Sequence, residues 1–264
     1  MSIEIISTDF DGTLVSDRYP TAYVPELIEC IESLRGRGAH WAINTGRTLM
    51  HIIEGLREHR FPYSPDYVLT NEREVFRQSP GHRDHEGWED FGEWNARCSS
   101  EHEHAFAMAQ EFFNQVEAYA VAQGRLRVVQ NGEILEGLVA DSEELMDEVV
   151  DYLDQTRMDF PLLGYQRNSV YLRFCHINYH KGSALAELSR LLGVDRQRIF
   201  AIGDNHNDIP MLDGSAAAMT ACPGNSVHEV RAAVRQSGGY VARHHASAGV
   251  VEAIGHFVDN PPQA

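Results

Sequence analysis

Hydrophobic and polar positions follow two different rhythms along the chain. Near the start, short apolar runs at residues 3–8, 40–44 and 67–70 alternate with segments whose apolar residues recur at helical spacing. This order returns from residue 181, where a helical pattern ends at Leu192 and two further apolar runs follow, at 198–202 and 217–220. Strands that alternate with helices are typical of a parallel sheet covered on both faces. The two stretches therefore predict an α/β fold, a Rossmann-like doubly wound parallel sheet.

Between these stretches the pattern changes. Residues 81–104 are polar and are interpreted as a loop, and residues 105–123 carry a helical pattern closed by Gly124. A second helical pattern starts after Ser142, a residue type that favours the first position of a helix.

Two hairpins complete the middle segment. Asn131-Gly132 is a strong turn signal between two strand-like runs, and a second turn is expected at Arg167 and Asn168. Helices joined to hairpins predict an antiparallel α+β unit inserted into the parallel one. We expect residues 1–80 and 181–264 to form the core and residues 81–180 to form an inserted cap domain.

The negative net charge of the chain excludes some classes of binding partner. The chain has 264 residues, of which 43% are hydrophobic, and a formal net charge of −17. Nucleic acids and anionic membranes bind basic surfaces, so neither is an expected partner. The four cysteines form no CxxC pair, and neither a signal peptide nor an apolar run long enough to cross a bilayer is recognised. We therefore expect a cytoplasmic protein.

Two acidic segments each follow a predicted strand. Asp9-Phe10-Asp11-Gly12-Thr13 follows the first strand, and Gly203-Asp204-Asn205-His206-Asn207-Asp208 follows the strand at 198–202. Open α/β sheets place ligands at the carboxyl ends of their strands, so these loops are expected to converge. Carboxylates brought together in this way repel one another unless a divalent cation lies among them. The alternatives are a plain Asp-Gly turn and a helix-capping role for Asp208.

Two further segments supply groups that bind anions. Thr45-Gly46-Arg47 combines a hydroxyl with main-chain amides at the start of a helix, a favourable place for a phosphate. Lys181 stands at the start of another helix, where a cation opposes the helix dipole unless an anion is bound nearby. The alternatives are a simple turn and a solvated lysine.

Together these segments resemble the four motifs of the haloacid dehalogenase superfamily, in the Cof-type branch of phosphatases with a large α/β cap. The motifs occur in the family's order: DxDGT at 9–13, TGR at 45–47, Lys-Gly at 181–182 and GDxxND at 203–208. The insertion between the second and third motifs is at the position of the family's cap. The resemblance therefore extends over nearly the whole chain.

The resemblance implies a role for each matching residue. Asp9 is expected to be the nucleophile that forms an aspartyl-phosphate, and Asp11 the general acid and base. Thr45 and Lys181 are expected to hold the phosphoryl oxygens. The expected Mg²⁺ ligands are Asp9, Asp11 through its main-chain carbonyl, Asp204 and Asp208, with Asp208 supporting the metal shell or Lys181. The expected phosphate-binding residues are Gly12, Gly46, Arg47 and Asn207.

One segment departs from the family pattern. The Cof-type branch usually has Asn-Gly-Ala where this chain has Asn71-Glu72-Arg73. These three residues, together with Arg167 and Asn168 of the last hairpin, are the candidate substrate contacts. The alternative for Glu72 and Arg73 is a surface position without a role in binding.

These observations predict an enzyme, a Mg²⁺-dependent phosphatase acting on a small phosphorylated metabolite such as a sugar or polyol phosphate. A monomer or a homodimer is expected. Two alternatives remain open: a phosphomutase of the same superfamily, and a non-catalytic protein that binds a phosphorylated ligand. Release of inorganic phosphate would distinguish the phosphatase from both.

Overall fold

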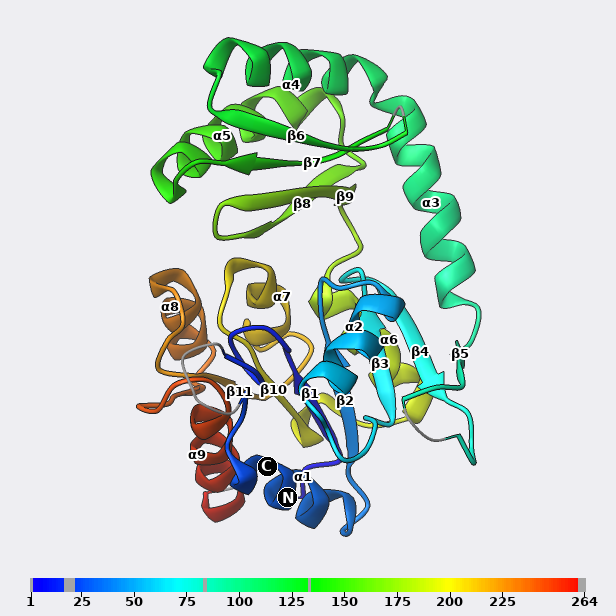
Figure 1. Cartoon of the computed structure of the whole chain (residues 1–264), viewed down its shortest axis with the longest axis vertical. Helices are drawn as coiled ribbons and strands as arrows, with labels where there is room; N and C mark the ends of the chain where they lie inside the picture. Colours follow the sequence, from blue (N-terminus) through cyan, green and yellow to red (C-terminus); the bar gives the residue numbers. More distant parts are fainter. Residues whose placement is uncertain (1, 17–21, 83–84, 133, 261–264) are drawn as a thin grey trace. The chain divides into compact units, whose positions relative to one another are not determined.

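The computed structural model describes residues 2–16, 22–82, 85–132 and 134–260, and the chain divides into two compact units. Figure 1 shows both units, coloured along the sequence. The first unit joins the two ends of the chain, Met1–Asn95 and Lys181–Ala264. The second is the continuous segment Ala96–His180. Each unit has a hydrophobic core of its own, so each is described separately.

The first unit is built on an eight-stranded sheet, in the order β12-β11-β10-β1-β2-β3-β4-β5. Neighbouring strands from β12 to β3 run parallel, whereas β4 and β5 extend the sheet as antiparallel strands. In chain order the strands are β1 (Ile5–Thr8), β2 (His40–Asn44), β3 (Tyr67–Thr70), β4 (Glu74–Gln78), β5 (Trp88–Asp90), β10 (Ile199–Ile202), β11 (Met219–Cys222) and β12 (Tyr240–Val241).

Helices cover both faces of this sheet. One core cluster joins the strands to α1 (Pro25–Arg35), α2 (Leu49–Glu58) and α9 (Ala246–Asp259). The other cluster joins them to α6 (Lys181–Leu192), α7 (Ile209–Leu212) and α8 (His228–Gln236). Because both faces are buried, β1, β10 and β11 contain only buried residues and show no alternation of apolar and polar positions. The predicted doubly wound α/β fold is confirmed.

The second unit is a four-stranded antiparallel sheet with helices against one face. Its strands are ordered β6-β7-β9-β8, where β6 is Leu126–Asn131, β7 is Ile134–Ala140, β8 is Leu163–Asn168 and β9 is Tyr171–His176. Helices α4 (Gln110–Gln123) and α5 (Glu143–Thr156) pack on this sheet around Phe112, Phe174 and Leu138. The hairpin expected at Asn131-Gly132 is present, although Glu133 of its turn lies outside the described residues.

Three expectations for the middle of the chain were wrong. The segment 81–104 is not a loop throughout, because it holds β5 and most of α3 (Trp94–Met108). The helical pattern at 105–123 belongs to two helices, which are interrupted at Ala109. The second hairpin turns at Ser169, whose φ is +52°, so Arg167 and Asn168 lie at the end of β8. The sequence did not predict the first part of α3, because few of its side chains are buried and most of those are small. Its sequence therefore shows no apolar stripe at helical spacing.

Short 3₁₀ turns complete the described structure, at Arg157–Asp159, Arg196–Arg198 and His206–Asp208. None of the helices among the described residues is long and apolar enough to span a membrane.

Candidate active site

The predicted site residues of the core lie where parallel strands end. Thr8, the last residue of β1, is paired with Ile43 of β2 on one side and with Ile202 of β10 on the other. The main-chain amide of Asp9 continues this register by donating to the carbonyl of Ile202 at 2.9 Å. The loops after β1, β2 and β10 therefore begin side by side, and the acidic segments 9–13 and 203–208 converge as expected.

A buried lysine joins two of the acidic groups. The Lys181 ammonium donates to Oδ1 of Asp9 and to Oδ1 of Asp208, at 2.6 Å each. The Lys181 side chain is 1% exposed, and burial alone would lower its pKa, but Asp208, Asp9 and Glu72 together raise it. Lys181 is thus held as a cation at the first turn of α6. The Asn44 amide fixes this turn by donating to the Lys181 carbonyl at 2.9 Å.

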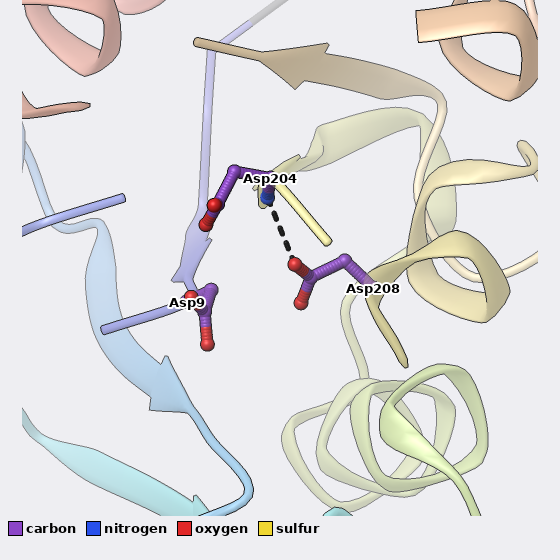
Figure 2. A group of neighbouring side chains, drawn as sticks. All are labelled: Asp9, Asp204 and Asp208. Atoms are coloured by element: carbon purple, nitrogen blue, oxygen red, sulfur yellow. Dashed lines mark hydrogen bonds between the residues drawn. The ribbon is translucent and has the colours of Figure 1, made fainter. Parts of the chain in front are cut away.

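Three carboxylates lie close together around this lysine. Figure 2 shows Asp9, Asp204 and Asp208, each of which has an oxygen within 4.8 Å of the others. Burial raises the pKa of Asp9 well above its ordinary value, against the effect of Lys181. Burial and the charge of Asp208 raise the pKa of Asp204 to about 7. The cluster is therefore short of positive charge, as a site for a divalent cation would be.

The three carboxylates differ in what surrounds their oxygens. Both oxygens of Asp208 are occupied: Oδ1 accepts from Lys181, and Oδ2 accepts from the main-chain amides of Asp204 and Asn205 at 2.8 and 2.9 Å. The Thr13 hydroxyl donates to Oδ1 of Asp204 at 2.7 Å. Asp9 and Asp204 therefore have more capacity for a metal ion than Asp208, which orients Lys181 and its own loop.

Gly12 makes room for this arrangement. Its φ is +80°, and a Cβ atom built there would lie 2.4 Å from Oδ2 of Asp204. The Gly12 carbonyl accepts from the Asn225 amide at 2.8 Å. The loop after β1 thus packs directly against Asp204, and only glycine permits both the backbone conformation and the approach.

Asp11 lies at the edge of the cluster and is paired with Arg47. The guanidinium donates to both carboxylate oxygens, at 2.8 and 2.7 Å, and stacks on the Phe10 ring at 4.9 Å. Half of the Asp11 side chain is exposed. The sequence predicted Arg47 as a phosphate ligand, whereas the structure directs its guanidinium to Asp11.

The predicted phosphate-binding residue Thr45 lies in the loop after β2. Thr45 is buried, and its hydroxyl accepts from the main-chain amide of Arg47 at 3.1 Å. Glu72 reaches this loop twice: its amide donates to the Thr45 carbonyl at 3.1 Å, and its carboxylate accepts from the Asn207 amide at 2.6 Å. Glu72 is 6% exposed, so it is not a surface residue.

The remaining candidate substrate contacts have other partners. The Asn71 amide donates to Glu74 at 2.8 Å, and the Arg73 carbonyl accepts from the Trp94 ring at 2.6 Å. In the second unit, Arg167 donates to Asp147 of α5 at 2.5 Å, and Asn168 ends β8. Asn71, Arg73 and Arg167 therefore each have a hydrogen-bond partner within their own unit.

Sequence reasoning missed Thr13 and Asn225 as parts of the site. Thr13 supports Asp204, and Asn225 spans the two acidic loops by reaching Gly12 and, at 3.5 Å, Oδ2 of Asp204. A usable signal existed for Asn225, because it follows β11 at the same edge of the sheet as Asp9 and Asp204.

Comparison with known proteins identifies the class. The haloacid dehalogenase-like hydrolase family matches residues 93–254. This chain belongs to that family, which makes it a hydrolase and confirms the resemblance seen in the motifs.

Among its relatives are phosphatases that match it over almost its whole length. A protein of Streptococcus pyogenes named as a phosphatase is 24% identical, covering 98% of this chain and 100% of its own. The 5-amino-6-(5-phospho-D-ribitylamino)uracil phosphatase of Bacillus subtilis is 23% identical, covering 98% and 97%. In fold, the chain is similar to the sucrose-phosphatase of Synechocystis, with a TM-score of 0.71, 21% identity and coverage of 98% and 99%.

Proposed function

We propose that this hydrolase is a Mg²⁺-dependent phosphatase that cleaves a small phosphate monoester through an aspartyl-phosphate on Asp9. The observation that carries the proposal is the buried Lys181 cation bound to Asp9 and Asp208, beside Asp204. Phosphoryl transfer depends on positioning and on charge neutralisation, and this cluster provides fixed groups for both.

The donor set fits a hard cation. All three clustered groups are carboxylates, the ligands that Mg²⁺ prefers, and the pKa values of Asp9 and Asp204 are raised by burial and by neighbouring carboxylates, which supports a site for a cation. Asp9 and Asp204 would hold the metal, with Asp208 acting through Lys181 and the loop amides. The metal, when bound, supplies positive charge for the phosphoryl oxygens.

The protein groups then have separate tasks. Asp9 attacks phosphorus with a carboxylate oxygen, and the bond from phosphorus to the ester oxygen breaks. For the first step Asp11 must leave its pair with Arg47 and take up a proton from solvent, which it gives to the departing oxygen; the resulting carboxylate then takes a proton from the water that attacks the aspartyl-phosphate. Inorganic phosphate leaves and Asp9 is regenerated as a carboxylate. Lys181 and Thr45 bind the phosphoryl oxygens, and the Arg47 pair keeps Asp11 at the edge of the site.

We assign substrate selection to the second unit, acting as a cap domain. Two of the relatives are named for substrates that carry a sugar or a ribityl phosphate, which supports a sugar or polyol phosphate here. Within the second unit, the sheet face that α4 and α5 leave uncovered bears Arg173 and Gln166, which are paired in register.

Release of inorganic phosphate tests the proposal. A panel of sugar and polyol phosphates is incubated with the protein, with and without Mg²⁺. We expect release only with the metal and none from Asp9→Asn, whereas Asp259→Asn, an exposed site at the end of α9, retains full activity. Activity of Asp9→Asn, or activity in EDTA, would contradict the mechanism. Transfer to a second hydroxyl without phosphate release would instead identify a phosphomutase.

A further inference from the structure

The loop between β3 and β4 carries the carboxylate of Glu72 on a strained backbone. Residues 70–73 form a tight turn in which the Arg73 amide donates to the Thr70 carbonyl at 3.0 Å. Asn71 and Glu72, the central residues, have φ of +50° and +63°. Two successive positive φ values define a type I′ turn, for which Asn-Gly is the favoured pair. Glu72 takes the glycine position at a cost in free energy, because a side chain there crowds the backbone.

What Glu72 contacts explains why the strain is tolerated. Its Oε1 accepts from the Asn207 amide at 2.6 Å, and a Cβ built on Gly46 would lie 3.3 Å from the same oxygen. Three of the predicted phosphate-binding segments therefore meet at this carboxylate: the Thr45-Gly46 loop, Asn207, and Lys181, whose pKa Glu72 helps to raise. The turn places a negative charge within the corner of the site that is expected to receive a phosphoryl group.

The carboxylate also decides how Asn207 is turned. An ionised glutamate only accepts hydrogen bonds, so it holds the NH₂ group of Asn207 toward itself. Oδ1 of Asn207 is buried and has no hydrogen-bond partner among the described residues. Glu72 thus accepts the hydrogen bond from the NH₂ group of Asn207, which an incoming phosphate would otherwise accept. The Oδ1 acceptor of Asn207 remains in the same corner.

We propose that Glu72 is a positioning residue that weakens the binding of phosphate to this corner and so favours release of the inorganic phosphate product. The inference rests on the proposed phosphatase function and deepens it. A like charge close to the phosphate opposes its binding, and the fixed Asn207 amide withholds part of its donor capacity. Binding that is too tight at this corner slows turnover when product release limits the rate.

The test compares two glutamates of the same turn. Glu72→Gln removes the charge and keeps the size of the side chain, whereas Glu74→Gln removes a charge whose oxygen accepts from Thr70 and Asn71. Titration calorimetry measures the binding of inorganic phosphate to the Mg²⁺-loaded proteins. We expect Glu72→Gln to bind phosphate about tenfold more tightly and Glu74→Gln to match the wild type. With a phosphate ester, Glu72→Gln should show a lower KM and a kcat that is unchanged or reduced.

A second variant guards against misfolding. Glu72→Gly restores the residue that the turn favours, so it should melt at the same temperature as the wild type or higher and also bind phosphate more tightly. A merely structural role predicts weaker binding and a lower melting temperature in both variants, and that result would overturn the inference. Unchanged phosphate affinity in both variants would overturn it as well.

The two proposals fail separately. If the wild type hydrolyses no ester, the phosphatase proposal is wrong. If the wild type hydrolyses esters but Glu72→Gln binds phosphate no more tightly, only the inference about Glu72 is wrong.

Discussion

Lys181 has almost no contact with solvent, yet it carries a charge. Removing an ammonium group from water costs several kcal/mol, and here two carboxylates at 2.6 Å offset that cost. Such an arrangement adds little to stability compared with an apolar core, so its value lies in fixing charges for a ligand. This arrangement of Lys181 with its two carboxylates lies at the edge of the sheet where the four motifs meet.

Gly12 offers a direct test of how closely the loops must pack. Gly12→Ala would place a methyl group 2.4 Å from Asp204, whereas Gly38→Ala meets nothing within 4 Å; both residues have positive φ, +80° and +95°. We expect each substitution to destabilise the fold by about 1–2 kcal/mol through backbone strain. Only Gly12→Ala should also lower kcat/KM, by about 100-fold, because it displaces Asp204, which we propose as a metal ligand. Equal activity of the two variants would refute the predicted packing.

At the residue scale, the sequence predicted the site residues that belong to a single loop, but it missed the contacts that connect two different loops. Asp9, Thr45 and Asp204 were predicted because each stands in a short motif after a strand, and Lys181 because it stands at the start of a helix. Thr13 was within the first motif, yet its bond to Asp204 connects residues 191 positions apart. Glu72 was recognised as a departure, but its burial depended on the type I′ turn, which an Asn-Glu pair does not signal.

Among the helices and strands, those that carry or border the candidate site residues were predicted most accurately. The predicted bounds of the strands at 40–44 and 67–70 and of the helix 181–192 agree with β2, β3 and α6. Strands β4 and β5, the last two of the sheet, were missed because they are partly exposed and carry mixed apolar and polar residues. Helix α3 was missed because its surface is polar nearly all round.

Two arginines of the second hairpin, Arg167 of β8 and Arg173 of β9, lie on opposite faces of the sheet. Tyr165 and Arg167 point to α5, where they bind Asp154 and Asp147. Arg173 of β9 is paired with Gln166, so it lies on the opposite face. We expect Arg167→Ala to lower stability by about 1 kcal/mol without changing KM. Arg173→Ala should raise KM for the true substrate about tenfold and leave stability unchanged. The reverse pattern would show that the face of the sheet was assigned wrongly.

The start of α9 is held by a single carboxylate. Glu252 accepts hydrogen bonds from the His244 and Arg243 main-chain amides, at 2.9 Å each, and from the Tyr240 hydroxyl at 2.8 Å. Burial alone would raise the pKa of Glu252, but these bonds, with those from the His244 and Arg243 side chains, lower it to about 2.

This shift makes the connection sensitive to acid. Because the folded pKa is below the ordinary value, ionised Glu252 stabilises the fold above about pH 4.5, and that contribution is lost as the pH falls toward 2. Glu252→Gln should lose about 2 kcal/mol at pH 7 and much less at pH 3, as measured by urea unfolding. Glu29→Gln, an exposed site on α1, serves as the control. A loss that does not change with pH would mean that the carboxylate charge is not involved.

The chain divides into two compact units, and this division should be visible in unfolding. All three tryptophans, Trp41, Trp88 and Trp94, precede residue 96, so their fluorescence reports only the first unit. Phe174 is 1% exposed in the second core, where it packs against Phe112 and Phe113.

Phe174→Ala therefore separates the two units experimentally. The substitution should destabilise the second unit by about 3–5 kcal/mol. We expect a new low-temperature transition in far-ultraviolet circular dichroism, while the transition seen by tryptophan fluorescence stays in place. A parallel shift of both signals would show that the two units unfold as one.

The distribution of charge follows the same division. Of the 39 acidic residues, 18 lie between Glu86 and Phe160, together with only 4 basic residues. The carboxylates of the site thus add little to the net charge of −17. The composition indicated solubility and the absence of a basic surface, whereas the position of the site came from the motifs alone.

The discontinuous first unit has a consequence for the order in which the protein forms during synthesis. The second unit is a continuous segment, so all of it has been translated before the chain reaches Lys181. Strand β1 leaves the ribosome first but gains its partner β10 only when residues 199–202 have been made. Asp9 must wait for Asp204 and Asp208 in the same way. The carboxylate cluster therefore cannot form until most of the protein exists, and an mRNA truncated before those codons would yield the whole second unit without that cluster.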